Sequence, residues 1–415
     1  MATLPAGGVK APSWLAETWR DIDRYWFATG SATTIGVFRI LLGFANLANL
    51  LLILPFFDAW FTERGFTPMA VNDRYFGPIA RDFYFFNQVY ILKFQVPRID
   101  VMANVTSTNV FLTFYIVLIL CAFLTTLGLW TRVSSILLAI GVVTLQHRNA
   151  IILHGGDNVL RIGAIYMAIA PSGKACSLDR LIGLWRGRFK PGPVLISVWP
   201  QRVIAFNLAL IYFTTWWVKM DGDRWRSGTA TWFPAHLNEF HRFWVPPFLQ
   251  SRLFVPVLTY GTLLTELALG TIVFWRPARK WVLLAGLLMH GYIEYAMNIP
   301  LFALSICSFY IAFYEGDEIA RWATGVGQRL KRLWITVRVP KQVDLQSGPV
   351  TALRAVDVFG LVAYEAAKVD HLEADGVRDP VRAVWLRSPG AWPLGLVPGL
   401  WGRLARKALL PRTSS

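Results

Sequence analysis

The chain has 415 residues, of which 55% are hydrophobic and only 16% are charged, whereas a soluble domain usually carries about a quarter charged residues. This composition indicates an integral membrane protein and excludes an ordinary soluble domain. The net charge of +16 is not evidence for nucleic-acid binding, because the basic residues of membrane proteins collect in cytoplasmic loops that face anionic lipid. We therefore expect the lipid bilayer as a partner and no nucleic acid.

Apolar segments recur along the chain, and roughly 20 apolar residues are needed to cross a bilayer as a helix. The predicted class is all-α, a polytopic transmembrane helix bundle followed by a small C-terminal tail outside the membrane. The fourth span could be a buried half-helix, and the last two could form one re-entrant pair. We count about eight spans, at about 33–56, 109–130, 133–153, 158–172, 202–219, 253–275, 280–297 and 300–315.

Basic residues mark one side of this predicted bundle. They gather in 172–202, in the RPARK turn at 276–280 and after 315. With eight spans, these three segments lie on the same side as the N-terminus, and the positive-inside rule makes that side cytoplasmic. We expect a multi-pass protein of the cell membrane, such as the bacterial cytoplasmic membrane, with both termini in the cytoplasm.

Three parts of the chain follow from this pattern. They are a cytoplasmic N-terminal segment (1–30), a transmembrane domain (31–315) and a cytoplasmic tail (316–415). Two interpretations of the tail stay open: a small cytoplasmic appendage, which would be a degenerate appended domain, or a helix near 400–410 that lies in the membrane interface. The three cysteines form no CxxC pair, so the sequence supports neither a disulfide framework nor a metal site.

An ionisable residue inside a predicted span needs a structural or functional explanation, since inserting its charge into the membrane costs at least about 2.5–3.5 kcal/mol. Arg39 in the first span can pair with backbone carbonyls or with an acid on a neighbouring helix. Glu266 in the sixth span has no basic residue three or four positions before it, so its partner must come from another helix. Structural pairing and a functional role both stay open for Glu266.

Two further pairs lie near the predicted outer ends of spans. His290 and Glu294 are four residues apart, so they share one face of a helix and can form a polar pair. His154 and Asp157 flank two glycines where the third span gives way to the fourth. Asp157 can cap the fourth helix, or the irregular backbone can line a pocket.

Lys219 lies at the end of the fifth span, in the stretch WWVKMDGDRW. Its long side chain can extend to the outer interface, where the flanking tryptophans would suit it. Alternatively, a lysine shielded from water can act as a base. Composition alone favours the first interpretation.

Several of these stretches together resemble the HTTM (horizontally transferred transmembrane) domain family, which is related to the vitamin K-dependent gamma-glutamyl carboxylase. The resemblance covers about 30–315 and follows the order of the family's elements. It rests on VFRILLGF (37–44), LQHRNAIILHGGDNVLRI with APSGKACSLD (145–179), YFTTWWVKMDGDRWRSGTA (212–230), LLTELALG (263–270) and MHGYIEYAMNIPLFALS (289–305).

The resemblance implies a chemistry for this site. In the carboxylase, the lysine that matches Lys219 is the base that deprotonates reduced vitamin K before oxygen and CO2 are used. The implied cofactor is a reduced quinone of the vitamin K or menaquinone type, and the implied substrate is a peptide or small molecule. The expected catalytic residues are Lys219, His290, Glu266 and Asp157, in one cavity that Arg39, His154, Glu294 and Tyr212 also line.

Two features differ from the carboxylase. Asp157 stands where the carboxylase has a histidine, and the chain has only about 100 residues after the last span in place of a large substrate-binding domain. The end of the tail faintly resembles a DCC thiol-oxidoreductase-like domain, but the DxxCxxC motif is absent. The alternative function is therefore a non-catalytic or accessory membrane protein that helps to mature or export a peptide. A secondary transporter is less favoured, because no paired broken helices occur in equivalent halves.

Overall fold

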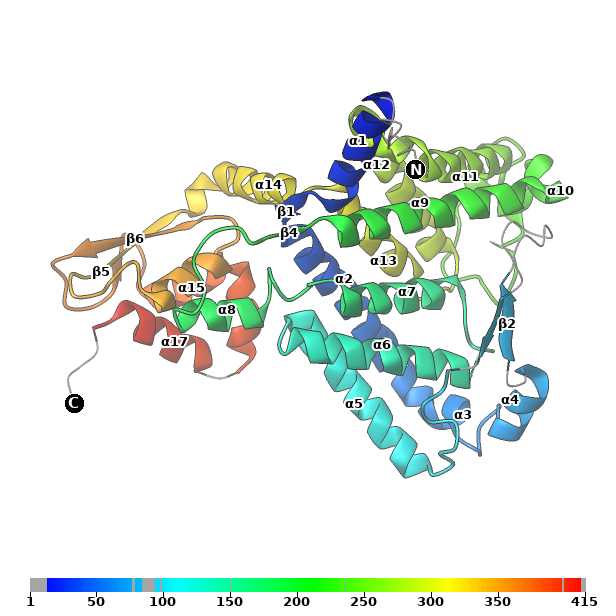
Figure 1. The fold of residues 1–415 in the computed structure, drawn as a ribbon, viewed down its shortest axis with the longest axis horizontal. Coiled ribbons are helices and arrows are strands. Elements are labelled where there is room, and N and C mark those ends of the chain that lie inside the picture. The colour runs from blue at the N-terminus through cyan, green and yellow to red at the C-terminus, as the bar shows by residue number, and fades with distance from the viewer. Residues whose placement is uncertain are drawn as a thin grey trace, which may run out of the picture.

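The computed structural model describes residues 13–76, 79–83, 94–97, 99–149, 151–234, 236–397 and 399–411. A bundle of long helices lies beside a smaller C-terminal unit with a sheet (Figure 1). Helices take up 67% of the structure, which confirms the prediction of a mainly helical protein. The first twelve residues of the predicted N-terminal segment lie outside the described residues, and helix α1 (Ser13–Phe27) follows them.

A helix occupies each of the predicted spans. The central helix α2 (Thr33–Ile53) packs against α5, α7 and η5, and its Phe38 and Leu42 are fully buried in the main core. The other helices of the bundle are α5 (Thr108–Leu127), α6 (Thr131–Arg148), α7 (Gly155–Ile169), α9 (Trp199–Met220), α11 (Phe254–Gly270), α12 (Arg276–Ala296), α13 (Phe302–Cys307) and η5 (Ser308–Phe313).

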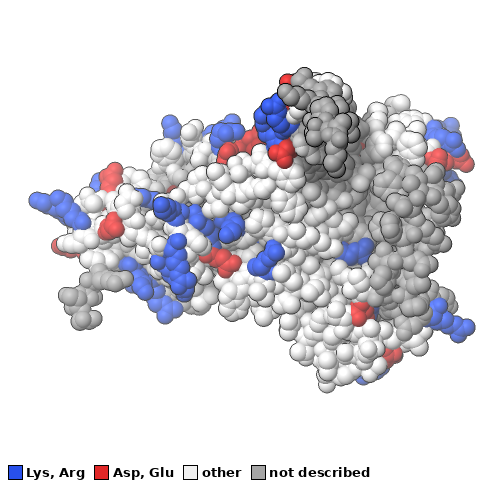
Figure 2. Space-filling view, viewed as in Figure 1, with Lys and Arg blue, Asp and Glu red and all other residues white. Residues whose placement is uncertain are grey.

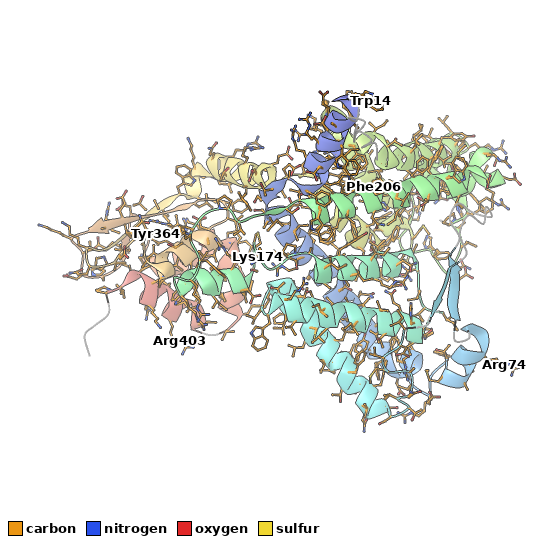
Figure 3. All side chains as sticks on the ribbon, in the orientation of Figure 1. Trp14, Arg74, Lys174, Phe206, Tyr364 and Arg403 are labelled. Carbon is orange, nitrogen blue, oxygen red and sulfur yellow. The ribbon has the colours of Figure 1, made fainter. Side chains whose placement is uncertain are left out.

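Three described helical segments are long and apolar enough to cross a membrane: Thr33–Phe61, Thr108–Leu127 and Trp199–Met220. Phe254–Gly270 and Phe302–Phe313 are apolar but shorter. The count of about eight spans therefore stays a prediction. Exposed apolar side chains also occur on the bundle, among them Leu264, Leu288 and Phe206. Figure 3 labels Phe206 on α9. Such a surface is typical of a protein that contacts lipid.

Short elements connect these helices. Strands β1 (Thr29–Ser31) and β4 (Leu195–Ser197) pair antiparallel, which holds the starts of α2 and α9 together. Strands β2 (Ile79–Phe83) and β3 (Phe94–Pro97) form a second antiparallel pair. The remaining elements of this part are η1 (Leu54–Phe56), α3 (Phe57–Phe61), α4 (Met69–Phe76), α8 (Leu178–Trp185), α10 (Asp223–Arg226), η2 (Ala230–Trp232), η3 (Pro247–Gln250) and η4 (Ile272–Phe274).

The C-terminal unit mixes strands and helices, so the prediction of an all-α protein is wrong for this part of the chain. Strand β5 (Ile335–Pro340) pairs in parallel with β6 (Val362–Ala367) and antiparallel with β7 (Glu373–Ala374). A helix joins the two parallel strands, as such connections require. The helices here are α14 (Gly316–Arg329), η6 (Lys331–Leu333), α15 (Gly348–Val356), α16 (Pro380–Arg387), η7 (Pro389–Leu396) and α17 (Leu400–Leu409).

Helix α17 forms at the stretch where one of the two interpretations of the sequence placed a helix in the membrane interface. However, its apolar residues Trp401, Ala405 and Leu409 are buried in a core that the C-terminal unit builds for itself. That core includes Val337 and Val339 of β5. The interfacial placement is therefore corrected: the apolar side of α17 is covered by protein, and its amphipathic pattern reflects packing against α15, α16 and η7.

Candidate functional site

Lys219, in the last turn of α9, points into the bundle. Its Nζ donates a hydrogen bond to Oε1 of Glu266 on α11 and forms an ion pair with it. The Glu266 side chain is only 7% exposed and the Lys219 side chain 25% exposed. Nζ also lies 5.0 Å from the ring centroid of Trp225, within cation–π range. The amine is therefore held by partners on two other elements, unlike a lysine that extends to lipid headgroups.

The Lys219–Glu266 pair lies in the wall of an apolar pocket of about 550 Å³. Its walls come chiefly from α11 and α12, where Leu288 and Met289 supply apolar surface. Phe302 and the hydroxyl-bearing Thr231 and Thr262 also line it. The pocket is therefore suited to a mostly apolar molecule that presents a polar group to the ion pair.

A chain of buried hydroxyl and imidazole groups lies beside this pocket. The Tyr212 hydroxyl is 2.7 Å from Nε2 of His290 and 2.9 Å from the Tyr310 hydroxyl. Tyr212 is seven residues before Lys219, so both side chains lie on one face of α9. The His290 ring lies against Phe302, with 5.4 Å between ring centroids, and this phenylalanine separates it from the pocket.

Two buried polar atoms near this pocket lack a hydrogen-bond partner among the described residues. They are Oε2 of Glu266 and Nδ1 of His290. Leaving a buried polar atom unpaired is costly, so such atoms occur where a water molecule or a ligand completes the site. Both atoms belong to residues that the sequence had already singled out.

The expected pairing of His290 with Glu294 is not formed. Oε1 of Glu294 accepts a hydrogen bond of 2.8 Å from Arg242, and Oε2 accepts one of 3.1 Å from the Ala303 backbone. Spacing of four residues placed both side chains on one helix face, but Arg242 from a distant loop offers Glu294 a stronger, charged partner. Glu294 therefore ties the end of α12 to the loop that contains Arg242 and to the start of α13, and it does not orient His290.

His154 and Asp157 lie in a second cavity, of about 230 Å³, instead of the single cavity that the sequence predicted. Pro300 lines this smaller cavity, whereas Ile299 and Phe302 line the larger one, so the chain at 299–302 separates the two. His154 is the N-cap of α7, and Oδ2 of Asp157 accepts a hydrogen bond of 2.9 Å from the His154 backbone N–H. The expected capping role of Asp157 is thus present, in the form of a capping box.

Arg39 is fully buried and serves the backbone. Its guanidinium donates to the carbonyls of Ser172 (3.1 Å), Thr125 (2.8 Å), Thr126 (3.2 Å) and Cys176. Pairing with backbone carbonyls is one of the two roles that the sequence predicted, and it ties α2 to the end of α5 and to the loop before α8. Arg39 lines neither of the two cavities.

Sequence reasoning missed several contacts of this region. Tyr310 and Arg242 carry no local motif, and only the fold brings them to Tyr212 and Glu294. Trp225 lies in the quoted stretch WWVKMDGDRW, but its contact with Nζ of Lys219 was not predicted. Tyr310 lies in an apolar stretch, where a single hydroxyl gives no periodic signal. Among the described residues, no group of three or more His, Cys, Asp or Glu side chains could hold a metal ion.

Comparison with known proteins shows the family to which the chain belongs. No curated protein and no solved structure matches the chain. The model of the HTTM domain, by contrast, matches residues 27–317, which contain the whole bundle and both cavities. This match covers well over half of the chain, and the chain therefore belongs to the HTTM family of membrane proteins.

Proposed function

We propose that this HTTM protein is a membrane enzyme of the carboxylase-like or quinol-oxidising type, with Lys219 as its general base. The observation that carries the proposal is the Lys219–Glu266 ion pair in the wall of an apolar pocket. A base that removes a proton from an apolar substrate needs an amine shielded from bulk water and a place to hold the proton.

The ion pair supplies a proton store. In surroundings of low dielectric, the neutral form of an acid–base pair competes with the charged form, because two charges are costly to keep out of water. With the shared proton on Oε1 of Glu266, Lys219 is a neutral amine whose lone pair accepts a hydrogen bond from that hydroxyl, and rotation of the hydroxyl away from Nζ frees the lone pair for the pocket. Nζ can then accept a proton from an acidic hydroxyl, and the resulting ammonium stabilises the anion beside it.

The residues of the pocket fit a reduced quinone. Leu288, Met289 and Phe302 would contact its ring, and Thr231 or Thr262 could hydrogen-bond to its oxygens. When bound, such a molecule supplies the acidic hydroxyl and the reducing equivalents. Tyr212 and His290 would serve a supporting role, since their hydrogen-bond chain holds His290 against Phe302.

The experiment is an assay of quinol oxidation and CO2 incorporation in purified membranes. We expect Lys219→Ala to abolish both activities. Lys280→Ala is a matched control, since Lys280 is an exposed lysine at the start of α12, remote in sequence from the pair. Equal activity of Lys219→Ala and wild type would remove the base assignment and leave the accessory role in peptide maturation or export as the better proposal.

A further inference from the structure

The smaller cavity, of about 230 Å³, has a polar lining that the proposed chemistry does not use. It lies between the end of α2, the end of α6 and the start of α7. Leu52 and Phe56 line it and are 52% and 59% exposed, so the cavity opens at the surface of the bundle. A molecule can therefore enter it without passing through the Lys219 pocket.

Three amide side chains in the lining are oriented by their own hydrogen bonds. Asn46 donates through Nδ2 to the Leu42 carbonyl at 2.9 Å. Gln146 donates through Nε2 to the Asp157 carbonyl at 2.7 Å, and Asn49 donates through Nδ2 to Oδ1 of Asp157 at 3.4 Å. Each partner can only accept, so the NH2 group of each amide must face it. This orientation turns each amide oxygen away from that partner, so the oxygen and the second N–H of each amide remain for other contacts.

One of these oxygens is a buried atom without a partner. Gln146 is only 6% exposed, and its Oε1 accepts no hydrogen bond within the described chain. The capping box accounts for Oδ2 of Asp157, but it does not account for this unpaired acceptor. A buried acceptor that stays unpaired destabilises the protein, and a ligand that donates a hydrogen bond to it would remove this cost.

The cavity also carries a negative charge. Asp157 lines it, and none of the described residues in the lining is Lys or Arg. The His154 ring is held in place by the start of α7: its Nδ1 accepts a hydrogen bond of 3.0 Å from the Gly156 backbone, and its Nε2 lies 3.6 Å from Oδ2 of Asp157.

The remaining walls are aromatic and aliphatic, with Trp60, Phe56 and Phe61 among them. Aromatic rings attract a cation through their electron-rich faces. Acceptor oxygens, one carboxylate and aromatic walls together match a compact group with several N–H donors and a positive charge. We propose that this cavity is a separate binding site for a primary ammonium group, belonging either to a soluble amine or to an amine-bearing lipid headgroup.

The test is equilibrium binding of hexylamine to the purified full-length protein in detergent, with hexanol as the uncharged comparison. We expect hexylamine to bind and hexanol to bind at least about tenfold more weakly, since hydrogen bonds to charged groups contribute roughly 1.5–3 kcal/mol. Asp157→Asn keeps the shape and an acceptor for the His154 N–H but removes the charge, so it should weaken hexylamine by about tenfold or more. Glu266→Gln is the matched control, because it neutralises the acid of the other pocket and should leave hexylamine binding unchanged.

Asn49→Ala is a second variant, since Asn49 is only partly buried and its loss is less of a risk to folding. We expect it to weaken hexylamine binding severalfold. Full binding by a folded Asp157→Asn, or by Asn49→Ala if Asp157→Asn does not fold, would overturn the proposal, and so would loss of binding in Glu266→Gln alone. Because quinol oxidation is not measured here, failure of the ammonium site leaves the Lys219 proposal standing.

A lipid arm distinguishes the source of the ammonium group. The wild-type protein and Asp157→Asn are purified from vesicles that contain phosphatidylethanolamine and phosphatidylcholine, and the retained lipids are measured by mass spectrometry. Selective retention of phosphatidylethanolamine by the wild type, lost in Asp157→Asn, assigns the site to a lipid headgroup. Hexylamine binding without such retention assigns it to a soluble amine.

Discussion

The contributions of Lys219 and Glu266 to stability depend on each other, because the two side chains form an ion pair that is largely shielded from water. Removing one partner of a fully buried pair costs about 3–5 kcal/mol. The Lys219 side chain is a quarter exposed, so solvent screening lowers the expected cost of Lys219→Met to about 1–3 kcal/mol. Thermal unfolding in detergent should show this loss.

The double variant Lys219→Met with Glu266→Leu provides the comparison. It removes both charges, so we expect it to be more stable than Lys219→Met alone. The single variant Glu266→Leu completes the cycle. If the losses of stability in Lys219→Met and Glu266→Leu simply add in the double variant, the ion pair makes no net contribution to stability and the two side chains act independently.

Tyr212 is the centre of the buried hydrogen-bond chain. Tyr212→Phe keeps the ring but leaves His290 and Tyr310 without their shared partner. We expect a loss of about 1–3 kcal/mol in the free energy of unfolding, which is the usual cost of an unpaired buried polar group. The matched control is Tyr295→Phe, because the Tyr295 hydroxyl donates to a carbonyl at an exposed position. Equal effects of the two variants would contradict the importance of the buried chain.

The charged residues inside the bundle could be found from the sequence, but their partners could not. A charge within an apolar run identifies Arg39, Lys219 and Glu266 without any structure. Their partners come from other helices or from backbone carbonyls, and sequence spacing carries no information about such contacts. For the same reason, a correct helical spacing of His290 and Glu294 still led to a pair that does not form.

Helix α6 begins against a carboxylate from another helix. Asp179 on α8 accepts hydrogen bonds from the Trp130 and Thr131 backbone N–H groups at 2.9 and 2.8 Å, and from the Thr131 hydroxyl at 2.7 Å. These N–H groups have no partner within their own helix. Asp179→Ala should therefore cost about 0.5–2 kcal/mol, by analogy with the loss of a helix cap.

Asp317 is the control for this prediction. It is an exposed acid in the first turn of α14, and Asp317→Ala should change the midpoint of thermal unfolding much less than Asp179→Ala. Similar shifts for both variants would mean that Asp179 acts only as a general helix-end charge. The SLD stretch of the sequence thus has a physical explanation, since Ser177 caps α8 while Asp179 caps α6.

The helices of the bundle were predictable and the small sheet was not. Long apolar runs set the positions of α2, α5 and α9 and leave little room for another structure. Strand β5, in contrast, is only six residues long, and the prediction of an all-α protein did not use its ITVRV alternation, which matches its buried and half-buried positions. Its pairing with β6 and β7 is a separate matter, because the local sequence does not encode which strands pair.

The described part of the chain has two hydrophobic cores, and helix α8 connects them. The bundle core is built around α2, and the C-terminal core is built around β5. Leu181 and Trp185 of α8 pack against the C-terminal core, although α8 belongs to the loop between α7 and α9. In Figure 3, Lys174 lies in that loop, between the bundle and the C-terminal unit that contains Tyr364. The two cores are therefore joined at the end of the bundle that the charge pattern predicts to be cytoplasmic.

The side of the membrane on which the C-terminal unit lies distinguishes between the two possible numbers of membrane-crossing helices. Lys and Arg gather over this unit in Figure 2, and such residues favour the cytoplasmic side. With eight spans the unit is cytoplasmic, whereas with only α2, α5 and α9 crossing it would lie outside. We expect Lys368→Cys, in a chain lacking the native cysteines, to escape a membrane-impermeant maleimide in intact cells and to react after permeabilisation.

Arg252→Cys, in the segment before α11, is the companion variant, and it should react in intact cells because both topologies place this segment outside. Both positions are exposed in the structure, so accessibility of the thiol does not limit either reaction. Labelling of Lys368→Cys in intact cells would refute the eight-span topology. It would also require the basic residues of the C-terminal unit to face away from the anionic leaflet, against the charge preference that orients membrane proteins.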